Sequence, residues 1–167
     1  MAPRSEPAMS STERVLPSFR RARVPWMLLW IALTLGMFVP WWLYRQTRVI
    51  NAHCKTFRIP ELLVHIGVVS WVVYTVLALF NQAGNPTATL PTTVPLAVQI
   101  AGFAANVVML AWTLFVRIGI NALSGAKLGE RHWVSFPLTL LSALFLPVAP
   151  LYLQYKINLN LDARRTA

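Results

Sequence analysis

The sequence predicts an all-α integral membrane protein with four apolar helical segments, and charge and composition carry this prediction. Residues 62–116 contain no Asp, Glu, Lys or Arg, although the whole chain of 167 residues has a formal net charge of +10. Because a bilayer core about 30 Å thick requires roughly 20 apolar residues for each helical crossing, this run holds two crossings and the turn between them. The chain is also 56% hydrophobic and only 12% charged, which excludes a typical soluble domain.

The segments that are apolar, uncharged and of about the length of a helical crossing are residues 24–44, 62–80, 96–116 and 133–155. The chain between them is rich in residues that break helices. One connection reads Asn-Gln-Ala-Gly-Asn-Pro at residues 81–86, and the next reads Ser-Gly-Ala-Lys-Leu-Gly-Glu at residues 124–130. We therefore expect both connections to lie in water.

We divide the chain into a basic N-terminal tail at residues 1–23, one membrane domain at residues 24–160, and a short C-terminal tail at residues 161–167. The first tail combines Pro and Ser with few apolar side chains, so we expect it to be disordered. The apolar run that follows has no small-residue cleavage site, so we expect it to remain in the mature protein. The single cysteine, Cys54, excludes an internal disulfide.

The distribution of Lys and Arg is the evidence on membrane orientation, because cytoplasmic flanks collect these residues. If all four segments cross, eight of the 15 cations lie on one side and seven on the other, which gives no bias. If the first segment enters and leaves on the same side, the split becomes twelve against three. If the last segment does so as well, all 15 cations share one side.

Proline in both outer segments supports such re-entrant hairpins. Pro40 has no amide hydrogen, and in a helix its ring presses on the carbonyl of Gly36, which is itself a poor helix former. Pro147 and Pro150 interrupt the last segment in a similar way. We expect the first and last segments to be hairpins broken at Pro40 and at Pro147/Pro150, covered by the two central helices. The alternative, that proline only kinks four crossing helices, stays open.

Three segments end in a similar pattern, an aromatic residue, a cation and then Ile-Asn, at residues 43–51, 114–121 and 151–158. One interpretation is general: aromatic side chains prefer the membrane interface, cations extend to headgroups, and Asn helps to end a helix. The other is specific: the first and last copies share Leu-Tyr-x-Gln, so they are matching ends of two hairpins related by an internal repeat. Both interpretations stay open.

The first segment reads TLGMF at residues 34–38, WLYR at residues 42–45 and IN at residues 50–51. This pattern resembles the TLGIY…W-YR…IN signature of a small bacterial membrane family called domain of unknown function 4234, from which it departs at Met37 and Phe38. A closing Q…N element of that family has its counterpart near the C-terminus. The resemblance spans residues 24–160 and brings no established activity. The positions that it marks as family motif are Gly36, Trp42, Arg45, Asn51, Gln154 and Asn158.

Side chains suited to acid–base or metal chemistry gather only at His53, Cys54, Glu61 and His65. Glu61 and His65 are four residues apart, so they share a helix face and can meet. The spacing lacks the regular Cys/His pattern of a metal site, and Cys54 has no base partner except its neighbour. Glu61 also suits the first turn of a helix that follows Pro60. We expect no enzyme, metal or cofactor; a membrane enzyme using Glu61 and His65 is the alternative.

Small residues recur every fourth position in the third segment, at Ala97, Ala101 and Ala105. Such a face lets another helix approach closely. Asn106 lies in the middle of the same segment, where an amide in hydrocarbon needs a partner. We interpret these residues as a helix-packing or partner surface, with a pore or substrate contact by Asn106 as the alternative.

The leading functional hypothesis is a non-catalytic accessory subunit or scaffold that acts through protein or anionic-lipid contacts. The cations lie beside apolar runs, so anionic headgroups, and not nucleic acid, are the expected counter-charge. The residues expected to bind lipid are Arg20, Arg21, Arg23, Arg45 and Arg48. The alternative is a small passive translocator of lipid or solute, which the repeat and Asn106 motivate.

The expected location is the bacterial inner membrane, with several passes and a cytoplasmic N-terminus. The expected partners are membrane lipids together with a second copy of the chain or another membrane protein.

Overall fold

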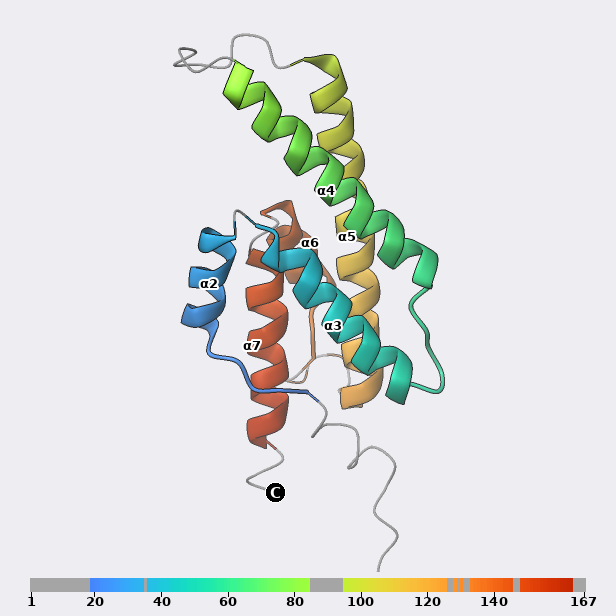
Figure 1. The fold of residues 1–167 in the computed structure, drawn as a ribbon. Helices are drawn as coiled ribbons and strands as arrows, with labels where there is room; N and C mark the ends of the chain where they lie inside the picture. The colour runs from blue at the N-terminus through green and yellow to red at the C-terminus, as the bar shows by residue number, and fades with distance from the viewer. Residues whose placement is uncertain are drawn as a thin grey trace, which may run out of the picture.

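The computed structural model of the protein describes residues 19–34, 36–84, 95–125, 128, 130, 133–145 and 148–163. These residues contain no strand, so the prediction of an all-α chain is confirmed (Figure 1). Their six helices are α2 (Val24–Leu33), α3 (Phe38–His53), α4 (Glu61–Gly84), α5 (Leu96–Ser124), α6 (Phe136–Leu144) and α7 (Val148–Ala163). The loop of residues 85–94 and the first 18 residues of the predicted tail lie outside the described residues.

The two long helices, α4 and α5, pack against each other and extend together beyond the rest of the bundle (Figure 1). Glycine permits the close approach. A Cβ atom added at Gly67 would lie 2.7 Å from Cε3 of Trp112, and one added at Gly102 would lie 2.9 Å from Cε2 of Tyr74. In this pair an aromatic ring of the partner helix occupies the space above each glycine.

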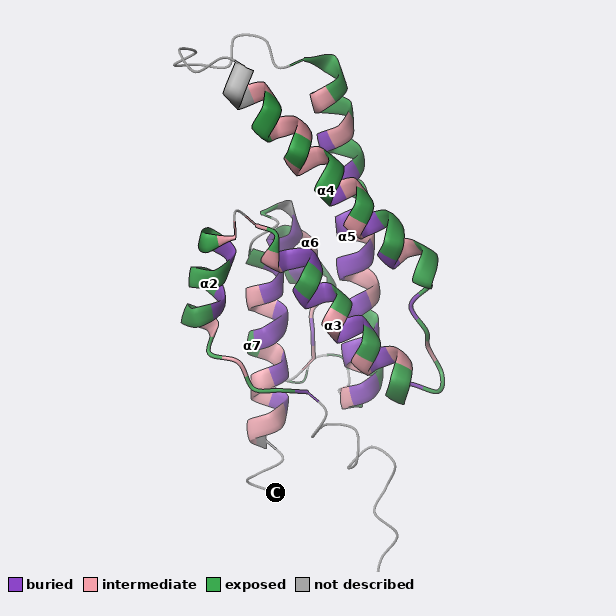
Figure 2. Cartoon of the chain, in the orientation of Figure 1, coloured by how far each residue is buried: buried purple, intermediate pink, exposed green. Residues whose placement is uncertain are grey.

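Only two helices of the described residues are long and apolar enough to cross a membrane, Glu61–Asn81 and Leu96–Ser124. The prediction of four helical segments of crossing length is therefore corrected: each outer segment is divided into two shorter helices. Only 11% of the most apolar part of α4 is buried, and exposed positions recur along this helix (Figure 2). A helix in the core of a soluble domain buries its apolar side chains, whereas a helix that faces lipid exposes them.

The first apolar segment is a helical hairpin. Helices α2 and α3 run in opposite directions, so the two ends of the segment point to the same end of the bundle (Figure 1). The chain reverses between α2 and α3, where Gly36 has a φ of +86°, a left-handed conformation that suits glycine. The hydroxyl of Thr34 accepts a hydrogen bond of 3.0 Å from the amide of Phe38 at the start of α3.

The predicted break at Pro40 is corrected by this geometry. Pro40 is the third residue of α3, and the break precedes it. In the first turn of a helix the missing amide hydrogen of proline has no partner to lose, so proline is tolerated there.

The last apolar segment is built in the same way. Helix α6 carries Pro137 in its first turn, as α2 carries Pro25, and α7 has Pro150 as its third residue, as α3 has Pro40. Helix α7 contacts α6 and runs back toward the end of the bundle from which the chain came (Figure 1). The predicted break at Pro150 is corrected for the same reason as that at Pro40, and Pro147 lies outside the described residues.

Candidate functional site

Two asparagine side chains bind the backbone of the residue that lies two positions before a helix. The Nδ2 atom of Asn51 donates to the carbonyl of Ile59 over 3.0 Å, and its Oδ1 accepts from the amide of Ile59 over 2.8 Å. Asn121 makes the same pair of bonds with Val134, of 3.1 and 2.9 Å. Ile59 and Val134 are both buried and precede α4 and α6. Each asparagine therefore fixes how the chain enters the next apolar helix.

A third asparagine acts on the first helix. The Nδ2 atom of Asn158 donates to the carbonyl of Ala22 over 2.8 Å, and Ala22 lies two residues before α2. The Oδ1 atom of Asn158 accepts from Nε2 of Gln154 over 3.0 Å. The Ile-Asn pattern at the three segment exits thus has one shared role, which is to hold the entrance of another helix. Asn51, Asn121 and Asn158 all lie inside their helices, and their side chains bond backbone groups outside them.

Gln154 is the centre of a buried polar network. Its Oε1 atom accepts a 3.1 Å hydrogen bond from the indole Nε1 of Trp42, and its Nε2 atom donates to the carbonyl of Arg20 over 3.2 Å. Trp42 is 2% exposed and Gln154 1%. A buried amide that is fully paired in this way fixes the arrangement of the elements it joins. Here those elements are α3, α7 and the segment before α2.

The N-terminal segment therefore differs from the predicted disordered tail at its last five residues. Phe19 is buried in the core, and the carbonyls of Arg20 and Ala22 accept bonds from α7. Residues 19–23, which belong to the predicted tail, are held against the bundle. Earlier residues lie outside the described part of the chain.

The positions marked by the family resemblance divide into two groups. Trp42, Gln154 and Asn158 meet in the network above, whereas Gly36 makes the turn of the first hairpin and Asn51 holds the entrance of α4. The remaining motif residue is Arg45, whose guanidinium carbon lies 5.9 Å from the ring centre of Trp41. The other motif residues take part in turns or hydrogen bonds that hold the fold together.

The expected lipid-binding cations lie on the surface. Arg20, Arg21, Arg23 and Arg48 are exposed, and Arg45 is half-buried. Arg21 also forms a 3.0 Å ion pair with Asp162, and both partners are largely exposed. Such a surface pair contributes about 0–1 kcal/mol, so it does little to hold the segment in place.

Every Lys and Arg within the described residues lies in the segment before α2, in α3 or the loop after it, late in α5, or in the second half of α7. Figure 1 shows these parts together at the end of the bundle opposite the tip of the α4–α5 pair. We call this set the cationic end: Arg20, Arg21, Arg23, Arg45, Arg48, Lys55, Arg58, Arg117 and Lys156.

Arg117 is a member of the cationic end that the sequence analysis did not single out. Its Nε atom donates to the carbonyl of Val134 over 2.9 Å, beside the bonds of Asn121. Its guanidinium also lies 5.4 Å from the ring centres of both Trp133 and Phe136. The cation of this exit pattern therefore helps to hold the start of α6, and the exit pattern is the sequence signal that marks it.

The expected small face of α5 is buried only in part. Ala105 is completely buried, Ala101 is half-buried and Ala97 is exposed. Asn106 is exposed, and its Nδ2 atom donates over 2.7 Å to the carbonyl of Gly102 in its own helix. The amide of Asn106 is thus paired within its own helix, on an exposed part of α5.

The two histidines among the residues suited to chemistry each bond a backbone carbonyl of their own helix. The ring Nδ1 of His65 bonds the backbone carbonyl of Glu61 over 2.8 Å, and that of His53 bonds the carbonyl of Val49 over 2.9 Å. Cys54 is buried. Within the part of the chain that the structure describes, no group of His, Cys, Asp or Glu is arranged to hold a metal ion.

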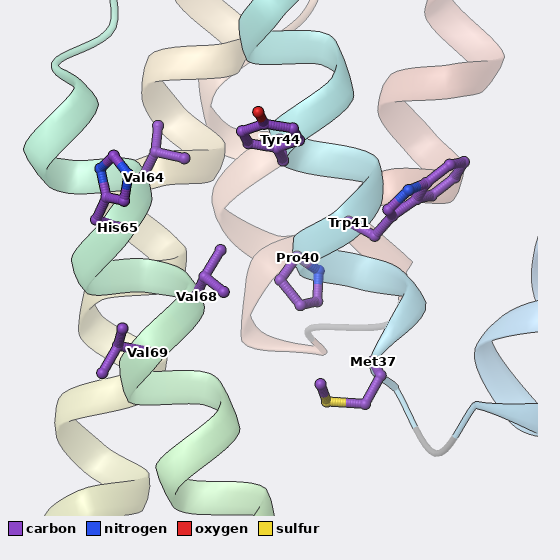
Figure 3. Close-up of a pocket in the computed structure, with 8 residues that line it drawn as sticks. All are labelled: Met37, Pro40, Trp41, Tyr44, Val64, His65, Val68 and Val69. Atoms are coloured by element: carbon purple, nitrogen blue, oxygen red, sulfur yellow. The ribbon is translucent and has the colours of Figure 1, made fainter.

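A groove of about 390 Å³ lies between α3 and α4, and sequence reasoning did not identify it. Its α3 wall includes Trp41 and Tyr44, and its α4 wall includes Val69 and His65. Tyr44 and His65 lie at one end of the groove, whereas Val69 lies toward the other end (Figure 3). Three of the four lining residues on α4 are valines, which look like ordinary lipid-facing residues in the sequence, so no local pattern marks the groove.

Comparison of the chain with protein-family models, with curated proteins and with solved structures found no match.

Proposed function

We propose that this chain is a non-catalytic membrane protein, an accessory subunit or scaffold that acts through anionic lipids and a protein partner at its cationic end. One observation carries the proposal. Both hairpins have their open ends at the cationic end, while the opposite part of the α4–α5 pair carries no Lys or Arg among the described residues (Figure 1). A fold that sorts its charges in this way suits a membrane whose cytoplasmic leaflet is anionic.

In this proposal α4 and α5 cross the bilayer, and the two hairpins enter from the cytoplasmic side and return. Helix α2 has 10 residues and α6 has 9, so each is about 14–15 Å long, half of a hydrocarbon core about 30 Å thick. Helices of this length cannot cross, but they can dip into one leaflet. Neighbouring helices are needed to cover the turns, and both hairpins contact α5.

The cationic end supplies the proposed lipid contacts. Each cation near a membrane surface contributes about 1 kcal/mol of attraction to anionic headgroups. Arg20, Arg23 and Arg48 are exposed and can each reach a headgroup in this topology. Lipid binding by this surface therefore does not depend on one residue.

The exposed part of α5 supports the proposed protein contact. Ile100 is 60% exposed and Phe103 74%, and Ala97 and Asn106 are exposed on the same helix. An interhelical hydrogen bond from an amide such as Asn106 contributes roughly 0.6–2 kcal/mol in a membrane. We propose a second copy of the chain, or another membrane protein, as the partner of this part of α5.

The proposal also includes a cellular location and a family. We place the protein in a bacterial inner membrane with a cytoplasmic N-terminus, as a member of the family called domain of unknown function 4234. The joint role of Trp42, Gln154 and Asn158 supports that membership, because residues that resemble one signature take part in one network.

The test is extraction in a mild detergent followed by native mass spectrometry and blue-native electrophoresis. We expect phosphatidylglycerol or cardiolipin to be retained in preference to phosphatidylethanolamine, together with a second copy or another membrane protein. A protein that appears only as a monomer, without anionic lipid and without any partner, would contradict the proposal.

A further inference from the structure

We propose that the groove between α3 and α4 binds one acyl chain of an anionic phospholipid, whose phosphate lies against Arg45 and Arg48. This inference rests on the proposed function, and it assigns lipid binding to a defined place on the surface. The groove of about 390 Å³ lies within the range of about 300–1,000 Å³ that is usual for small-molecule sites.

The walls of the groove suit a hydrocarbon chain. Pro40 and Met37 on one side face Val68 and Val69 on the other (Figure 3). Val69 is 60% exposed and Trp41 53%, so the groove is open to its surroundings along its length. In a bilayer those surroundings are lipid tails, and an open apolar groove there is filled by a chain.

The polar groups of the groove lie at one end only. Tyr44 and His65 are at this end, and Met37 and Val69 are at the other (Figure 3). Because α3 runs toward the cationic end, the hydroxyl and imidazole mark the end nearest to the headgroup layer. Tyrosine and tryptophan are enriched at that depth in membrane proteins.

Positively charged side chains lie near the polar end of the groove. Arg48 is exposed and lies one helical turn after Tyr44 on the same face of α3. Arg45 lies over Trp41, with 5.9 Å between its guanidinium carbon and the ring centre. Glu61 is the acidic residue nearest in sequence to His65, and the loop before it adds Lys55 and Arg58. The charged residues around the polar end of the groove therefore carry a net positive charge, which favours an anionic headgroup over a zwitterionic one.

These features favour a lipid over a partner helix. A helix in a groove is held by apolar anchors along its whole length. Here the apolar walls lead to a phenol, an imidazole and two arginines, the order of groups that a phospholipid requires from tail to phosphate.

The test uses phosphatidylglycerol that carries a photoreactive diazirine in one acyl chain, with the protein in phosphatidylcholine nanodiscs. Labelled residues are identified by mass spectrometry. The reference probe is phosphatidylcholine with the same diazirine chain. We expect phosphatidylglycerol to label the α3 and α4 walls of the groove at least about fivefold more than phosphatidylcholine, the factor contributed by one near-surface cation.

Two variants separate the groove from the general lipid layer. Val69→Trp fills the groove and is expected to abolish the excess labelling, whereas Val73→Trp, one turn further along α4 and 47% exposed, leaves it unchanged. Arg48→Gln changes an exposed side chain. We expect it to reduce labelling by phosphatidylglycerol by up to about fivefold, the factor contributed by one near-surface cation, while Arg45 keeps the remaining attraction.

Equal labelling by both lipids around the whole of α4 would overturn the inference. If anionic lipid still co-purifies with the protein while the groove shows no excess labelling, this inference fails and the proposed function stands. If no anionic lipid is retained at all, both fail.

Discussion

The indole Nε1 of Trp42 donates a 3.1 Å hydrogen bond to Oε1 of Gln154, a buried contact between residues 112 positions apart that joins the two hairpins. It orients the amide of Gln154 so that Nε2 reaches both the carbonyl of Arg20 and Oδ1 of Asn158. The first hairpin, the last hairpin and the N-terminal segment are thus joined through one side chain.

Replacing Gln154 by Leu is expected to lower the free energy of unfolding by about 1–3 kcal/mol, because the indole of Trp42 and the amide of Asn158 lose a buried partner. The measurement is chemical unfolding in mild detergent, followed by circular dichroism. The control is Tyr155→Leu, the next residue along α7, which is 49% exposed and is expected to change stability by less than about 0.5 kcal/mol. Equal effects of the two variants would show that the network adds nothing to stability.

Asn51→Ala is expected to speed hydrogen exchange at the amide of Ile59 and in the first turn of α4, because that amide loses its acceptor. Asn121→Ala is expected to do the same at Val134 and the start of α6. Each variant is the control for the other, since the two loops are separate. Exchange that rises in both loops in either variant would indicate general loosening and contradict a local role. Hydrogen-exchange mass spectrometry resolves the two peptides.

Gly119→Ala is expected to destabilise the fold by about 1–3 kcal/mol, because the new Cβ would lie 2.5 Å from Cγ2 of Ile50. Ile50 is completely buried, so it has little room to move. Ile50→Ala removes the obstructing atoms but leaves a cavity, which costs about 2–5 kcal/mol. The double variant is expected to lose less stability than the two single losses together, and simple additivity would show that the two residues do not collide.

Cysteine labelling tests the proposed topology. In a Cys54→Ala background, Arg21→Cys and Lys55→Cys are expected to react with a membrane-impermeant maleimide from the same side. Thr87→Cys, in the loop between the two long helices, is expected to react from the opposite side. Labelling of the Arg21 and Lys55 replacements from opposite sides would show that the first segment crosses the membrane.

The two long helices were predictable because the absence of charged side chains over residues 62–116 is read directly from the sequence. The uncharged run of residues 62–116 contains most of α4 and the larger part of α5. The hairpins were favoured because four crossing segments would divide Lys and Arg almost evenly between the two sides. The position of the first break was not predictable from Pro40 alone. Proline at the third residue of a helix is tolerated, and the reversal instead uses Gly36 in a left-handed conformation.

The sequence showed the Ile-Asn pattern but not its purpose. The partners of Asn51, Asn121 and Asn158 are backbone groups, which every residue carries, so nothing in the sequence marks them. The groove was missed for a related reason. Val69 reads as one more apolar residue of a long helix, and only the placement of α3 beside it creates a site.

The short reach of the two hairpins gives the molecule unequal cross-sections. The two hairpins lie beside the lower part of the α4–α5 pair, whereas at the far tip only α4 and α5 remain among the described elements (Figure 1). In the proposed orientation the protein displaces more lipid from the inner leaflet than from the outer one. Its shape is then that of a wedge. A membrane whose cytoplasmic face is convex accommodates such a wedge with less strain than a flat membrane does.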